Sequence, residues 1–106
     1  MKHTVNAVLY QGIVENKWIS ISYVNKDNQN TDYYIGIKDI DIKKDLIFCD
    51  IYNPFKEASL IGKDDLRIKL SGIKKAKVLE QTYYPTPQKL LDDVSANTDL
   101  QNFLLL

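Results

Sequence analysis

The isoleucines between residues 35 and 42 change phase part-way along an otherwise alternating apolar pattern. Ile35 and Ile37 occupy odd positions, whereas Ile40 and Ile42 occupy even ones. Because successive side chains of a β-strand point to opposite faces, a regular strand cannot place all four on one side. We therefore expect a bulge or a sharp bend near residues 38–39. Strongly bent strands allow a short sheet to curl around its own core.

Other segments with strand or helix periodicity fill most of the first 84 residues. Apolar residues at helical spacing predict an opening helix over about residues 4–14, with Thr4 as its N-cap. Alternation predicts strands at 18–24, 32–37, 46–52, 66–70 and 76–80. The strand at 46–52 is apolar on both faces, so we expect it to be central. These elements predict a mainly β fold, a small half-open barrel of five strands behind an N-terminal helix.

The connections between the predicted strands differ in character. The polar run at 25–30 predicts a hairpin loop, and Ser71-Gly72 predicts a tight turn between the last two strands. Residues 55–63, which follow a turn at Asn53-Pro54, are expected to form an irregular connection with one helical turn.

The chain changes character after Tyr83-Tyr84. Thr86-Pro87 is typical of a helix start, after which Leu90, Leu91 and Val94 are expected to face the barrel. We expect residues 1–84 to form the barrel domain with its leading helix, and residues 85–106 to form a helical tail. The leucines at the end of the sequence, 104–106, lead us to expect that the tail continues into a further region of a longer protein.

Composition limits the partners and the compartment. The 14 basic and 14 acidic residues give a formal net charge of zero, which argues against strong nonspecific attraction to nucleic acid. Cys49 is the single cysteine and excludes an intrachain disulfide, so it is interpreted as a small apolar residue of a reduced protein. We find no secretory signal and no apolar run of membrane-spanning length, and we expect a cytoplasmic protein without a membrane partner.

Groups suited to catalysis are scarce. His3 is the sole histidine and lies near the start of the sequence, and Cys49 has no histidine near it in sequence. No glycine-rich phosphate loop is present. Four acidic residues are expected to face solvent and not to bind a metal ion, because their spacing matches no calcium loop: Asp39, Asp41, Asp45 and Asp50. The sequence predicts a protein that is not an enzyme and needs no cofactor or metal.

Basic residues gather late in the chain. The run from Leu66 to Ile73 alternates apolar and basic residues, which places Arg67 and Lys69 on the exposed face of a strand, and Lys74, Lys75 and Lys77 follow. This set predicts a groove for an anionic ligand or a single-stranded nucleic acid, beside which Trp18 and Tyr34 stack bases. The other interpretation is a solvated strand face that discourages edge-to-edge pairing, a common use of lysine.

Residues 5–84 resemble a WYL domain, the ligand-sensing module attached to many bacterial regulators and helicases. The family's opening helix and Ile-x-Ile-x-Tyr strand match residues 5–14 and Ile19-Ser20-Ile21-Ser22-Tyr23. Tyr33-Tyr34-Ile35-Gly36-Ile37 occupies the place of its Arg-x-Val-x-Pro strand, and Leu46-Ile47-Phe48 that of its Trp-Tyr-Leu triplet. Ile68-Lys69-Leu70-Ser71-Gly72-Ile73 corresponds to the closing Phe-Arg-Leu-Asp-Arg-Ile, where Lys69 keeps a basic position. The other signature polar residues are replaced.

The resemblance implies an Sm-like or Src-homology-3-like barrel with a regulatory, nucleic-acid-sensing role. We expect a noncatalytic accessory domain of a larger bacterial protein that binds an anionic ligand or a nucleic-acid strand. Its expected site residues are Lys69, Arg67, Lys38, Tyr33 and Tyr34. The alternative is a protein-interaction module that docks on other domains of its parent protein or self-associates through Leu100–Leu106, because an exposed apolar patch usually has a partner.

Overall fold

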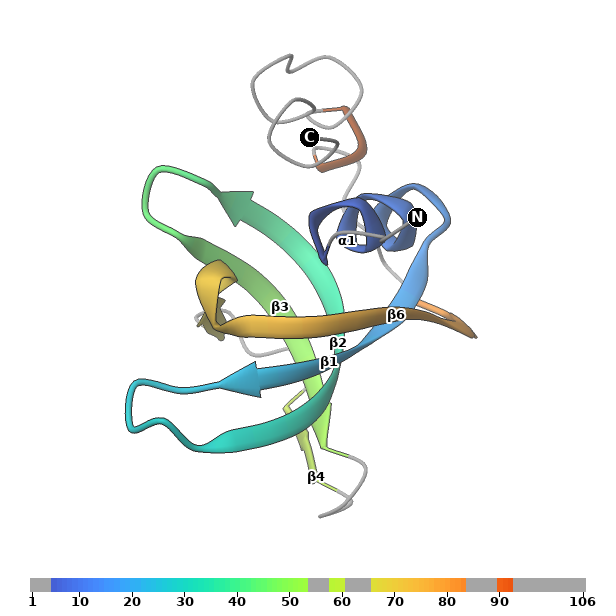
Figure 1. Ribbon diagram of the computed structural model, residues 1–106. Helices are drawn as coiled ribbons and strands as arrows, with labels where there is room; N and C mark the ends of the chain where they lie inside the picture. The colour runs from blue at the N-terminus through green and yellow to red at the C-terminus, as the bar shows by residue number, and fades with distance from the viewer. Residues whose placement is uncertain (1–4, 54–57, 61–65, 84–89, 93–106) are drawn as a thin grey trace.

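A bent antiparallel sheet dominates the computed structural model, which describes residues 5–53, 58–60, 66–83 and 90–92 (Figure 1). One helix, α1, precedes the sheet, and a short 3-10 helix, η1, interrupts it. The elements in chain order are α1 (Val5–Val14), β1 (Lys17–Val24), β2 (Asn30–Asp41), β3 (Leu46–Asn53), β4 (Ala58–Leu60), β5 (Arg67–Lys69), η1 (Leu70–Gly72) and β6 (Ile73–Thr82).

The strands are ordered β4-β3-β2-β1-β6, and β5 pairs with β3 beside β4. β3 is therefore central, as its two apolar faces predict, with β2 on one edge and both β4 and β5 on the other. The hydrogen-bonded ladder is open, because β4 and β6 end the path without pairing to each other in the described part of the chain. The mainly β prediction is confirmed, whereas the pairing does not form a closed barrel.

The phase change in β2 produces the expected bulge. Ile37 pairs with Cys49 and Asp39 pairs with Phe48, so Lys38 is an extra residue without a counterpart on β3. Beyond the bulge Ile40 pairs with Ile47 and packs against the core cluster. The extra residue thus keeps the isoleucines of both phases on the core side, and β2 curves strongly along its length (Figure 1).

Several element boundaries differ from the predictions, and β2 extends from 30 to 41 in place of 32 to 37. The connection after β3 contains the short strand β4 at 58–60, in place of an irregular segment. The predicted strand at 66–70 is shorter, because Leu70 belongs to the η1 turn, and β6 extends from 73 to 82 in place of 76 to 80. A three-residue strand gives too few alternating positions for periodicity to reveal it.

The core lies between α1 and the concave side of the sheet. Leu9 and Ile13 of α1 pack with buried isoleucines of every long strand, and Leu90 joins them at 1% exposure. Its segment, 90–92, is helical, as predicted, and the rest of the predicted tail, including Val94, lies outside the described residues. The buried set from the sheet and η1 comprises Ile19, Ile21, Ile35, Ile37, Ile47, Cys49, Ile51, Ile68, Leu70 and Ile73.

Asparagine and aspartate fill the turns that need a left-handed backbone. Asn16, Asn28 and Asp45 have φ values of 57°, 62° and 58°. These residue types tolerate that region better than other non-glycine residues. In the β1–β2 hairpin the Asn25 side-chain oxygen also accepts the backbone N–H groups of Asp27 and Gln29, each at 2.9 Å. The hairpin loop predicted at 25–30 is therefore present at 25–29 with its own internal hydrogen bonds, and Asn30 already belongs to β2. Among the described helices, none has the length and apolar character needed to cross a membrane.

Gly36 lies under an aromatic ring. A Cβ atom built at this position would collide with the ring of Tyr83, which is 1% exposed. We expect Gly36→Ala to lower the free energy of unfolding by about 1–3 kcal/mol, because the ring must shift to admit the methyl group. Urea unfolding followed by circular dichroism measures the change. Ser20→Ala, on the neighbouring strand, is the control, and a Gly36→Ala protein as stable as wild type would contradict this packing.

Candidate functional site

The face of the sheet opposite the core, which we call the outer face, carries rows of paired residues. Tyr34 pairs with Ser20 of β1 on one side and with Tyr52 of β3 on the other. Ser20 in turn pairs with Lys77 of β6. Paired residues of adjacent strands point to the same face, so one row across four strands reads Lys77, Ser20, Tyr34 and Tyr52.

Aromatic side chains from three strands line a hollow on this face. We call it the aromatic hollow. Its volume is about 340 Å³, and the residues that line it are Trp18, Tyr34, Tyr52, Leu79 and Gln81. The rings of Tyr34 and Tyr52 lie 6.0 Å apart between centroids and are tilted by 34°. All three aromatic side chains are half-buried, so each keeps part of its ring surface open to solvent. The hollow therefore offers apolar ring faces to a ligand.

Tyr83 fixes one end of the aromatic hollow. Its ring lies over Gly36 and meets the ring of Trp18 edge to face, with centroids 5.0 Å apart and planes at 76°. Its backbone N–H donates to the carbonyl oxygen of Asn16 at 2.7 Å, which ties the end of β6 to the turn after α1. Trp18 is therefore held from one side by a buried ring, and its orientation in the hollow is set by packing.

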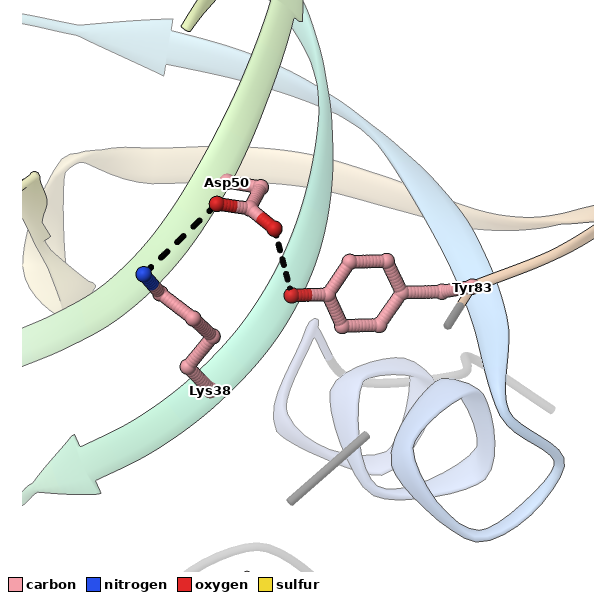
Figure 2. Close-up of polar contacts among 3 residues, drawn as sticks. All are labelled: Lys38, Asp50 and Tyr83. Carbon is pink, nitrogen blue, oxygen red and sulfur yellow. Dashed lines mark hydrogen bonds and ion pairs between the residues drawn. The ribbon is translucent and has the colours of Figure 1, made fainter. Parts of the chain in front are cut away.

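A buried carboxylate lies beneath Tyr83. The Tyr83 hydroxyl donates to Asp50 Oδ2 at 2.7 Å, and Lys38 Nζ lies 3.6 Å from Asp50 Oδ1 (Figure 2). Asp50 is 4% exposed, so the prediction that it faces solvent is wrong. Burial raises the pKa of the Tyr83 hydroxyl above its usual range, and the hydrogen bond to Asp50 adds to this rise. The Lys38 ammonium group and the Tyr83 hydroxyl thus offset the free-energy cost of burying the Asp50 carboxylate.

Two lysines extend the outer face along β6. Lys75 pairs with Ser22 and Lys77 pairs with Ser20, so both lie on the same face as Tyr34, and both are exposed. Asp32 of β2 adds a negative charge to the same face beside Ser22, and its carboxylate accepts a hydrogen bond from the Ser22 hydroxyl at 3.0 Å. Of the charged residues of β6, Lys75 and Lys77 lie on the outer face, and exposed Glu80 lies between Leu79 and Gln81 of the aromatic hollow.

The structure divides the five residues predicted for the site. Arg67 and Lys69 flank buried Ile68 on β5 and are exposed, as their alternation predicts. The backbone N–H of Lys69 donates to the Tyr23 hydroxyl at 3.1 Å, and the Tyr23 ring lies 6.2 Å from that of Tyr33. Tyr23 and Tyr33 therefore lie on the core side of β1 and β2, where Tyr33 packs against the core. Arg67 and Lys69 instead pair with Phe48 and Leu46 of β3 and point to the face opposite buried Ile68.

Lys38 and Tyr34 belong elsewhere. Lys38 lies at the β2 bulge beside Asp50, and Tyr34 lines the aromatic hollow. Tyr33 and Tyr34 are consecutive strand residues and point to opposite faces. The sequence-predicted set is thus not one cluster, and only Tyr34 lines the aromatic hollow.

Tyr52, Leu79 and Tyr83 were not singled out from the sequence. Tyr52 meets Tyr34 only through the β2–β3 register, and Leu79, inside the predicted strand at 76–80, reaches the hollow only through the pairing of β6 with β1. The signal that was available is Gly36, a glycine inside a strand, which often marks close approach of another group.

The thiol of the single cysteine lies inside the sheet. Cys49 is fully buried, and burial followed by the nearby charge of Asp50 raises the pKa of its thiol to about 12, which keeps the thiol protonated and unreactive. Within residues 5–53, 58–60, 66–83 and 90–92, no group of three or more histidine, cysteine or acidic residues is placed to hold a metal ion. His3 lies outside this part of the chain.

Comparison of the chain with protein families, with curated proteins and with solved structures found no match.

Tyr83→Phe tests the buried hydrogen bond to Asp50. We expect the free energy of unfolding to fall by about 1–3 kcal/mol at neutral pH, because a buried carboxylate loses a donor. The raised pKa of Tyr83 favours its neutral form in the folded state, so wild-type stability should fall as the pH rises above about 10. That fall should be shallower in Tyr83→Phe.

Urea unfolding at pH 7 and at about pH 11 measures both effects. Tyr52→Phe is the matched control, because it removes a tyrosine hydroxyl from a half-buried ring on the same face. Equal behaviour of the two variants at both pH values would contradict the role assigned to the Tyr83 hydroxyl.

Proposed function

We propose that this chain is a noncatalytic domain that binds a single-stranded nucleic acid on its outer face. The observation that supports this proposal best is the aromatic hollow, where Trp18, Tyr34 and Tyr52 come from three adjacent strands. Proteins that bind single strands combine such stacking surfaces with positive charge along the backbone path. In this proposal the domain regulates or positions a larger bacterial protein.

Stacking supplies the main attraction in this proposal. Each base stacked on an aromatic side chain contributes about 1–3 kcal/mol, largely independent of sequence. The Tyr34 and Tyr52 rings are tilted by 34° and do not stack in parallel on each other, so in this proposal each ring stacks with a base of its own. Unstacked bases of a single strand fit this surface, whereas bases of a duplex are already stacked on one another.

Charge plays a smaller part. Lys75 and Lys77 are exposed on the same face as Tyr34, and in this proposal they contact phosphate groups of the strand. Two phosphate contacts to a single strand give a slope of roughly −1.4 in a plot of log affinity against log salt. A chain with a net charge of zero fits such a weak salt dependence.

The finer fold assignment is part of the same proposal. We propose a WYL-like domain with an Sm-like or Src-homology-3-like barrel. The observed order of a helix, β1, β2, β3, the short strands β4 and β5, a tight turn and β6 supports it. The convergence of isoleucines from β1, β2, β3, β5 and β6 in one core also supports it. The alternative of docking through Leu100–Leu106 concerns a segment outside the described residues.

Paired aromatic substitutions test the stacking surface. We expect Tyr34→Ala with Tyr52→Ala to weaken binding of a fluorescein-labelled oligothymidylate by at least about tenfold, because two stacking faces are lost. The matched control, Tyr34→Phe with Tyr52→Phe, keeps both rings and should bind within about twofold of wild type. Fluorescence polarisation at low salt measures both affinities.

Trp18 provides a second measurement, because it is the only tryptophan. Its emission should be quenched as the oligonucleotide saturates the domain. Absence of binding by the wild-type domain, or equal affinity of the alanine and wild-type proteins, would overturn the proposal. Binding of a protein segment that depends on Tyr34 and Tyr52, without oligonucleotide binding, would favour the interaction-module alternative.

A further inference from the structure

A second hollow, about 240 Å³ in volume, lies away from the aromatic hollow, where the β1–β2 hairpin meets η1. Both elements lie on the left of Figure 1. We call it the lysine hollow, because Lys26, Lys69 and Lys74 line it from the hairpin, from β5 and from β6. Its other lining residues are Tyr23, Val24, Asn25, Ser71 and Gly72.

Tyr23 explains why three separate elements meet here. Its hydroxyl accepts the backbone N–H of Lys69 at 3.1 Å, which ties β5 to the end of β1. Its ring lies where a Cβ atom on Gly72 would be, so η1 approaches the ring closely only because residue 72 is glycine. The floor of the lysine hollow is therefore fixed by packing as well as by strand pairing.

The β6 register directs Lys74 to this hollow. Tyr23 pairs with Ile73 and Ser22 pairs with Lys75, so Lys74 is an extra residue at a β-bulge. Lys74 Nζ donates to the carbonyl oxygen of Ser71 at 3.1 Å. An ammonium group carries three donors, so two remain for a ligand. The bulge thus separates Lys74 from Lys75 and Lys77 and turns it toward η1.

The charged residues found lining the lysine hollow are Lys26, Lys69 and Lys74. All three lysines are exposed, and among the residues that the structure describes no acidic one lines the hollow. The acidic group that contacts its rim is Asp45, which accepts hydrogen bonds from both the backbone N–H and the hydroxyl of Ser71. Within the described residues, the one ion pair found involves Lys38 and Asp50, not these lysines. Three like charges around one concavity repel each other, and a bound anion relieves that repulsion.

We propose that the lysine hollow is a phosphate-binding site, separate from the aromatic hollow. A phosphomonoester or pyrophosphate carries several negative charges and several acceptor oxygens, which suit three ammonium groups from different directions. A single carboxylate offers less charge and fewer acceptors. The phosphate has two possible sources, a small free compound or the end of the strand that the proposed function places on the outer face.

Inorganic pyrophosphate is the probe for the site itself. Titration of the ¹⁵N-labelled chain should shift backbone resonances of residues 23–26 and 69–74, and Lys69→Gln with Lys74→Gln should weaken binding at least tenfold. The matched control is Lys43→Gln with Lys44→Gln, which removes the same charge from exposed positions in the β2–β3 turn. It should bind pyrophosphate within twofold of wild type. Absence of localised shifts, or equal loss in both double variants, overturns the proposal.

Oligothymidylates with and without a 5′-phosphate distinguish the two sources. Tighter binding of the phosphorylated oligonucleotide, lost in Lys69→Gln with Lys74→Gln, supports the site and assigns the phosphate to the strand end. Pyrophosphate shifts that persist when the domain is saturated with either oligonucleotide support the site and assign it to a free compound. The single-strand proposal and the phosphate-site proposal can be refuted independently. Quenching of Trp18 emission reports stacking on the outer face, and shifts of the backbone resonances of residues 69–74 report the phosphate site.

Discussion

Burial of the Asp50 carboxylate imposes requirements on three other parts of the chain. A charge that is 4% exposed is strongly unfavourable unless it has an opposite charge and hydrogen-bond donors. The β2 bulge supplies Lys38, the end of β6 supplies the Tyr83 hydroxyl, and Gly36 supplies the space for the Tyr83 ring. The bulge in β2, the position of Tyr83 after β6 and the burial of Asp50 therefore depend on one another.

This arrangement also determines what the outer face presents. With Tyr83 placed over Gly36, Trp18 has a buried ring against its edge and is directed toward Tyr34 and Tyr52. The aromatic side chains of the hollow are therefore ordered before any ligand arrives, which lowers the entropy cost of binding. The lysines of β6 divide between two surfaces because of one bulge, at Lys74. Two irregularities of strand register thus have separate roles: the bulge in β2 brings Lys38 to Asp50, and the bulge in β6 brings Lys74 to the lysine hollow.

Sequence reasoning succeeded where one strand contains the whole signal. The shift from Ile37 to Ile40 predicts the β2 bulge, and the alternation around Ile68 predicts exposed Arg67 and Lys69. It failed where the signal is spread across strands. Asp50 looks like a solvated charge until Tyr83, 33 residues away, is seen to cover it. Likewise, Tyr34 and Tyr52 become neighbours only once the register of β2 against β3 is known. Neither fact is contained in a local pattern.

The reactivity of the single cysteine reports how often the sheet opens. Cys49 lies at the middle of β3, fully buried, with a thiol that stays protonated at neutral pH. A thiol-alkylating reagent therefore reaches it only when the central strand separates from its neighbours, so the rate of alkylation follows the opening of the whole sheet. Both proposed binding surfaces lie apart from this atom, so ligand-induced protection of Cys49 would measure binding at either surface without a label on it.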